Sequence, residues 1–178
     1  MSALTEGFAV PPMRKVEIRA HAVNARNVLN LGDRRIDIPR LLDRLSADFG
    51  VNYDVIDEHS GVLPRGVEAC YVPEARTLYI SAPIFSEMSY GGQRAVFTLG
   101  HELGHIVLAH QRTLNRRQGQ LPIFCNSEWQ ANCFAAEFTM PASVITAYHL
   151  HTPDLIAERF GVSREAARNR LLDLGIHK

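Results

Sequence analysis

Hydrophobic residues recur every three to four positions along most of the chain, which is the spacing of a helix with one buried face. The pattern predicts helices over residues 14–29, 39–49, 95–109 and 128–140, with a short one beginning at residue 83. A proline opens the second of these helices and a glycine closes it. The chain is therefore expected to be mainly helical.

Three short stretches show strand patterns instead, at residues 51–56, 67–72 and 77–81. The last two flank residues 73–76, a four-residue connection typical of a hairpin. We expect a small, mainly antiparallel sheet packed against the helix of residues 95–109. Sheet and helices together predict an α+β fold.

Composition narrows the class of protein without naming a function. Of the 178 residues, 46% are hydrophobic and 21% charged, which is typical of a soluble globular protein. Lys plus Arg equals Asp plus Glu, 19 each, so no net charge points to nucleic acid or membrane. No apolar run is long enough for a signal peptide or a membrane span. We expect a cytoplasmic protein without a membrane partner, whose Cys70, Cys125 and Cys133 are buried thiols.

The most specific pattern is His101-Glu102-Leu103-Gly104-His105, which matches HExxH inside an apolar run. Four helical residues advance about 400°, so the two histidines lie one turn apart on one face. Two imidazoles at this spacing can bind one metal ion, and Glu102 can accept a proton from a water beside it. The sequence thus predicts a hydrolytic metal site.

A structural alternative is an amphipathic core helix whose histidines bond to neighbouring residues. Two unsatisfied imidazoles among apolar residues would each cost a few kcal/mol, which favours metal binding. Gly100 and Gly104 each cost the helix about 1 kcal/mol relative to alanine. Spaced four apart, they predict that another backbone approaches this helix closely.

A metal held by two histidines needs a third protein ligand. The pattern HExxHxxGxxH is excluded because the chain has Leu108 and Gln111 at its last two positions. If the helix continued, His110 would lie about 140° from His105, on the wrong face. The ligand is therefore expected on the next helix.

On that helix we expect Ser127 and Gln130 to form a capping box, which puts Glu128 in the first turn. Glu128 extends the buried stripe and is our predicted third ligand, although a carboxylate there is also favoured by the helix dipole alone. Glu137 lies about 180° away and is expected to face solvent. Asn132, one turn after Glu128, could orient a metal-bound histidine.

These two helical motifs resemble the ImmA/IrrE family of bacterial and phage metallopeptidases. The resemblance is carried by HELGH and by E-x-x-A-N-x-F-A-A-x-x-x-M-P at residues 128–141. The segments GVEACYVPEARTLYIS and LIAERFGVSREAARNRL are also similar, so the likeness covers roughly residues 40–175. Where the family often has Leu-Leu before Met-Pro, this chain has Phe138-Thr139.

The resemblance implies a zincin-like domain that acts as a zinc endopeptidase. Its metal ligands would be His101, His105 and Glu128, and its general base would be Glu102. The implied substrate is a helix-turn-helix (XRE-type) transcriptional repressor, whose cleavage releases phage, mobile-element or stress-response genes. Two histidines and a carboxylate accept Zn²⁺ or Mn²⁺. No residue is uniquely marked as an oxyanion donor, and Tyr148, His149 and His151 are candidates.

The C-terminal residues predict a helix-turn-helix-like pair. One helix starts at Thr152-Pro153, and Ser163 caps a second whose inward residues are Ala166, Ala167, Leu171 and Leu172. Arginines 164, 168 and 170 could contact phosphates, but acidic neighbours offset them. We favour repressor docking or plain packing over DNA binding for this pair.

The chain is thus divided into a loose leader and helix (residues 1–36), a metallopeptidase core (37–150) and the helix pair (151–178). Residues 111–122 are polar and basic and predict a solvated loop. Two other functions stay open. The protein could be a non-catalytic DNA- or repressor-binding regulator with a structural metal site, or a metallopeptidase with another substrate.

Overall fold

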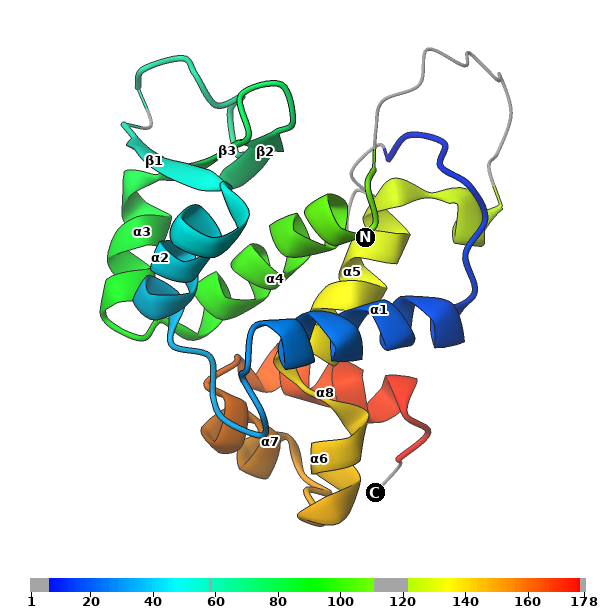
Figure 1. Cartoon of the computed structure of the whole chain (residues 1–178). Helices are drawn as coiled ribbons and strands as arrows, with labels where there is room; N and C mark the ends of the chain where they lie inside the picture. Colours follow the sequence, from blue (N-terminus) through cyan, green and yellow to red (C-terminus); the bar gives the residue numbers. More distant parts are fainter. Residues whose placement is uncertain (1–6, 58, 111–121, 177–178) are drawn as a thin grey trace.

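A computed structural model describes residues 7–57, 59–110 and 122–176, so the predicted loop at 111–121 lies outside the described residues. Figure 1 shows a small sheet at one corner, two crossing helices in the middle and a helical layer beneath them. The helices are α1 (Lys15–Val28), α2 (Ile38–Phe49), α3 (Ala82–Ser89), α4 (Gln93–Val107), α5 (Ser127–Thr139), α6 (Ala142–Ala147), α7 (Pro153–Phe160) and α8 (Arg164–Asp173), with a short 3₁₀ turn at Ile123–Cys125. The fold is α+β, as predicted.

The sheet is mixed rather than mainly antiparallel. Its strands are β1 (Asn52–Ile56), β2 (Ala69–Val72) and β3 (Thr77–Ser81), in the order β1-β3-β2. β2 and β3 form the predicted antiparallel hairpin, with Val72 opposite Thr77. β1 pairs with the other edge of β3 in parallel, because the chain crosses over before it enters β2. The edge strand β2 contacts α4, while α2 and α3 pack against β1 and β3.

The crossing of α4 and α5 is the centre of the hydrophobic core, and glycines let these helices approach closely. A Cβ added at Gly104 would lie 3.0 Å from the Cα of Ala131 and 3.1 Å from its carbonyl oxygen. A Cβ added at Gly100 would meet the Thr139 methyl at 3.0 Å and no backbone atom nearer than 3.5 Å. The close backbone approach predicted from the paired glycines is therefore confirmed.

A buried ion pair between α5 and α8 contradicts two expectations. Glu137 does not face solvent but is 3% exposed and paired with Arg170, which is 2% exposed. Arg170 also donates to the Met140 carbonyl at 3.0 Å, and Glu137 accepts the Ala142 amide at 3.0 Å. Helix geometry alone predicted that this face of α5 is exposed to solvent, but α8 packs on it. Arg170 is therefore buried and not available to phosphates.

The helix-turn-helix-like pair is formed by α7 and α8, whose caps are the predicted Thr152 and Ser163. Ala167 and Leu171 are buried as expected, whereas Leu172 is 52% exposed. The buried residues of this pair belong to the same hydrophobic cluster as those of α1, α4 and α5.

The segment before α1 is pinned rather than loose where the structure describes it. The Phe8 amide donates to the Ser127 hydroxyl at 3.1 Å, and the Ser127 amide donates to the Phe8 carbonyl at 3.1 Å. The Val10 amide donates to the Cys125 carbonyl at 2.9 Å. This segment therefore joins the start of α5.

Two further predictions concern the burial of the cysteines and the absence of a membrane span. The three predicted buried cysteines, Cys70, Cys125 and Cys133, are partly rather than fully buried. Within the described ranges, no helix is both long enough and apolar enough to cross a membrane.

We predict that Gly104→Ala lowers the free energy of unfolding by about 1–3 kcal/mol, because the new methyl overlaps backbone atoms that cannot move aside. The cost of this overlap would exceed the gain of about 1 kcal/mol that alanine brings over glycine in helix propensity. Chemical denaturation of the variant beside wild type measures it.

The matched control is Gly100→Ala, whose methyl meets a side-chain methyl first. Gly100→Ala should lower the free energy of unfolding clearly less than Gly104→Ala does. Equal stability of Gly104→Ala and wild type would contradict the close-approach argument.

Candidate metal centre

Three side chains with lone-pair donors meet where α4 crosses α5. His101 and His105 come from successive turns of α4, and Glu128 from the first turn of α5. Their ligand atoms all lie within 4.8 Å of one another. Across residues 7–57, 59–110 and 122–176, no other group of this kind is found. The structure thus brings together the three residues predicted as ligands.

The nearest distances among the three side chains are close to the edge of a coordination tetrahedron, with the two oxygens of Glu128 facing one histidine each. The two Nε2 atoms lie 3.1 Å apart, and Glu128 oxygens lie 3.2 Å from Nε2 of His101 and 3.5 Å from Nε2 of His105. Ligands about 2.0–2.1 Å from a tetrahedral Zn²⁺ are roughly 3.3–3.4 Å from one another. The donor set and its spacing therefore fit a divalent cation such as Zn²⁺.

The site is partly open to solvent. The side chains of His101, His105 and Glu128 are 19%, 16% and 22% exposed. Three protein ligands with an accessible fourth position are typical of catalytic zinc sites, whereas structural sites are closed by four protein ligands.

Asn132, the predicted partner of a metal-bound histidine, lies beside His101. Its Oδ1 lies 3.0 Å from Nδ1 of His101, so Nδ1 carries the proton and Nε2 points toward Glu128. Burial opposes protonation of His101, but the hydrogen bond to Glu128 and the two nearby carboxylates raise its pKa above 6.5. The same hydrogen bond lowers the pKa of Glu128. A proton on His101 thus occupies the place that a bound cation would take, and metal binding would release it.

His110 contacts His105, although helix geometry placed it on the wrong face. The helix ends at Val107 and Ala109 turns into the left-handed region at φ 52°. The His110 amide then donates to the His105 carbonyl at 3.0 Å, as in a Schellman motif, and the two Nδ1 atoms lie 2.9 Å apart. Extrapolating the helix to residue 110 was wrong because the helix had already ended.

The start of α5 differs from the predicted capping box by one residue. Asn126 is the N-cap and accepts the Trp129 amide at 2.9 Å, while Ser127 is the first helical residue and bonds to Phe8. The Gln130 side chain turns to His110 instead of capping the helix. Glu128 nevertheless stays in the first turn, where the prediction put it.

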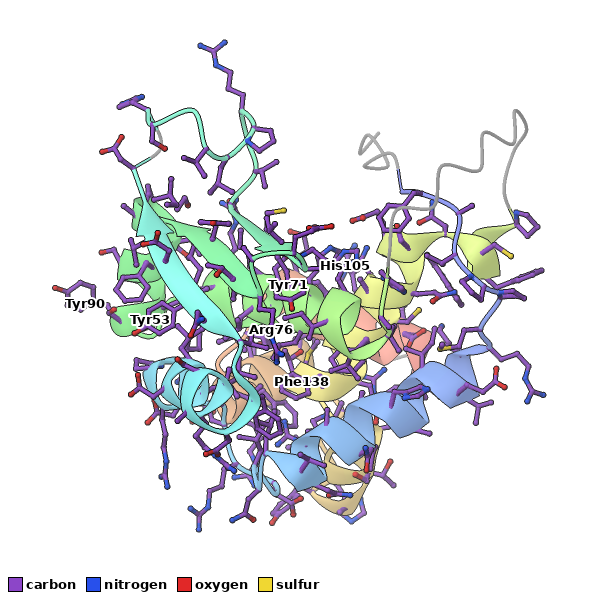
Figure 2. All side chains as sticks on the ribbon, turned by 45° about the horizontal axis from the view of Figure 1, so that its top comes forward. Tyr53, Tyr71, Arg76, Tyr90, His105 and Phe138 are labelled. Atoms are coloured by element: carbon purple, nitrogen blue, oxygen red, sulfur yellow. The ribbon has the colours of Figure 1, made fainter. Side chains whose placement is uncertain are left out.

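Glu102 lies on the side of α4 that faces the sheet. Its Oε2 accepts the Tyr71 amide of β2 at 3.0 Å, and Figure 2 shows Tyr71 and His105 in the same part of the molecule. Burial raises the pKa of Glu102 to about 7, and the charge of His101 only partly offsets this. Such a carboxyl can gain and lose a proton near neutral pH.

The proposed oxyanion donors are not brought to this cluster. Tyr148 follows α6 and stacks on Arg159 at 4.6 Å, while the rings of His149 and His151 lie 5.9 Å from each other. These residues follow the opposite end of α5 from Glu128 (Figure 1). Sequence reasoning missed the Tyr71 amide, which carries no motif, and rejected His110 because it extended the helix too far.

Comparison with known proteins identifies this part of the chain. Residues 88–172, which contain all three ligand candidates, match the model of a peptidase family described as "IrrE N-terminal-like domain". This segment is therefore similar to that family. No curated protein gives a significant sequence match to the chain.

The chain also resembles a solved structure, that of a Mycobacterium tuberculosis transcriptional regulator. The two share 19% sequence identity with a TM-score of 0.56, over 90% of this chain and 52% of the other. The chain thus spans about half the length of that protein, and the likeness establishes a common fold.

We predict a pH-dependent stability difference between the metal-free wild-type protein and its Glu102→Gln variant. The folded-state pKa of Glu102, about 7, exceeds the ordinary value of 4.5, so its ionised form destabilises the fold. This penalty is absent below pH 4.5, grows through pH 7 and is on the order of 3 kcal/mol at full ionisation.

The glutamine of this variant can still accept the Tyr71 amide but cannot ionise, so the variant should be increasingly more stable than wild type from pH 5 to pH 8. Denaturant unfolding at each pH measures the difference. A difference that does not change with pH would contradict the burial of an ionisable carboxyl here.

Proposed function

We propose that this protein is a zinc-dependent endopeptidase. One observation mainly supports the proposal. The ligand atoms of His101, His105 and Glu128 lie within 4.8 Å of one another. A buried carboxyl, that of Glu102, directly follows His101 on α4. The similarity of residues 88–172 to a peptidase family agrees with the proposal.

In this proposal His101, His105 and Glu128 hold the metal, and Mn²⁺ is an alternative to Zn²⁺. A bound divalent cation supplies Lewis-acid polarisation of the scissile carbonyl and lowers the pKa of water. Glu102 then takes the proton from the attacking water and later delivers it to the leaving amine. Its raised pKa suits both transfers, and the Tyr71 amide fixes the orientation of its carboxyl group. Asn132 keeps the ring of His101 turned toward Glu128.

We further propose that the substrate is a helix-turn-helix (XRE-type) transcriptional repressor, cleaved in the cytoplasm to release stress, phage or mobile-element genes. The support is the ImmA/IrrE resemblance of the sequence. It agrees with the structural similarity to a mycobacterial protein that is a transcriptional regulator. DNA contact is less favoured, since Arg170 is buried and Arg164 is paired with Asp154 at the surface.

A non-catalytic regulator with a structural metal site is the second candidate. The similar structure is that of a transcriptional regulator, which favours this candidate, whereas the partly exposed ligands of the candidate metal centre argue against it. The two candidates differ in whether any peptide bond is cut.

The experiment is a cleavage assay on XRE-type regulators from the same organism, with added Zn²⁺ or Mn²⁺. Wild type should produce a discrete cut. Glu102→Gln should bind metal as wild type does but cleave at least about 100-fold more slowly, because it removes the general base. His105→Ala should lose both metal binding and cleavage.

A chelator should stop cleavage by wild type, and restored metal should recover it. Full cleavage by purified Glu102→Gln would reject the assignment of the general base. Metal-loaded wild type that binds the regulator without cutting it would favour the non-catalytic candidate.

A further inference from the structure

A line of hydrogen bonds leads from His105 away from the metal centre. Nδ1 of His105 lies 2.9 Å from Nδ1 of His110, and Nε2 of His110 lies 3.0 Å from Oε1 of Gln130. The Gln130 amide nitrogen donates to the carbonyls of Pro11 at 2.9 Å and Phe124 at 2.8 Å. The line thus ends on two main-chain groups, one from the pinned segment before α1 and one from the turn before α5.

The two carbonyls at the end of this line determine which atom is the donor in each of its hydrogen bonds. A carbonyl only accepts, so the group of Gln130 that meets Pro11 and Phe124 is its NH₂, and its oxygen must face His110. Nε2 of His110 therefore carries a proton. In a neutral ring the other nitrogen is then an acceptor.

The proton between His110 and His105 consequently belongs to Nδ1 of His105. A neutral His105 with its proton on Nδ1 has a free lone pair on Nε2, the atom that lies 3.1 Å from Nε2 of His101. With the opposite tautomer, an N–H would point into the candidate metal position and block binding there. The tautomer of His105 thus decides whether the candidate centre can bind a cation.

The surroundings hold His110 in place. Its side chain is 8% exposed and that of Gln130 is 1% exposed, and the Phe8 ring meets His110 edge-on at 6.4 Å between centroids. The backbone bond from His110 to the His105 carbonyl fixes the two rings on the same turn. Two buried polar side chains with all their bonds satisfied form a rigid support.

We propose that His110 and Gln130 are positioning residues that hold His105 in its Nδ1–H tautomer and direct Nε2 toward the metal. This inference rests on the proposed metal site but concerns a property that exists before metal binds. Groups of this kind behind metal-bound histidines typically change metal affinity by 10–100-fold when they are removed.

The test compares His110→Leu with His110→Asn in the full-length protein. Leucine removes the acceptor that faces Nδ1 of His105. Asparagine can place its side-chain oxygen where Nδ1 of His110 lay, so it should restore that acceptor. Thermal unfolding of both variants establishes that they are folded, and the zinc experiments use them at temperatures well below the transition.

Two measurements are made at pH 8. Ring ¹⁵N chemical shifts of His105 in metal-free protein report which nitrogen carries the proton, and competition with a zinc chelator gives the zinc dissociation constant. We expect Nδ1–H in wild type and in His110→Asn, and a mixture of tautomers in His110→Leu. We expect His110→Leu to bind zinc 10–100-fold more weakly than wild type, and His110→Asn to recover most of this loss.

An unchanged His105 tautomer and unchanged zinc affinity in His110→Leu would overturn the inference. Equal weakening in both variants with the wild-type tautomer would also overturn it, since His110 would then act through packing alone. If wild type itself binds no zinc, the proposed function fails, while the ¹⁵N shifts still decide whether His110 sets the tautomer.

Discussion

The close approach of α4 and α5 is the constraint on which the candidate centre depends. Two histidines from one helix can meet a carboxylate from the other only because Gly104 lets the Ala131 backbone come within van der Waals distance. The helix tolerates glycines that weaken it on its own, since packing gained across the crossing outweighs their cost of about 1 kcal/mol each. On its sheet-facing side, α4 buries Glu102 beside β2, and this burial raises the pKa of Glu102.

Around this crossing, the polar side chains of the candidate centre on α4 each have a hydrogen-bond partner behind them. Asn132 lies behind His101, the Tyr71 amide behind Glu102, and His110 with Gln130 behind His105. Buried hydrogen bonds add only about 1 kcal/mol each to stability, but a missing partner costs about 1–3 kcal/mol. This asymmetry favours one arrangement of the side chains over any other, and so gives the centre a defined geometry before a metal binds.

The sequence predicted those features that depend on one helix or on two helical motifs. The spacing of His101 and His105 and the first-turn place of Glu128 follow from helical geometry, which holds along α4 and α5. Prediction failed where a distant segment changes the surroundings or where a helix ends. Glu137 is buried because Arg170, 33 positions later, packs against it. His110 turns back to His105 because Ala109 adopts a left-handed conformation without the glycine that usually marks such an end.

The most direct test of the central claim is X-ray absorption at the zinc edge of the zinc-loaded protein. The claim is that two imidazoles and one carboxylate hold a single divalent cation where α4 and α5 cross. We predict one zinc per chain in a shell of nitrogen and oxygen atoms at about 2.0–2.1 Å, with two of the ligands showing imidazole scattering. Sulfur ligands at about 2.3 Å, or the absence of tightly bound zinc, would contradict the account.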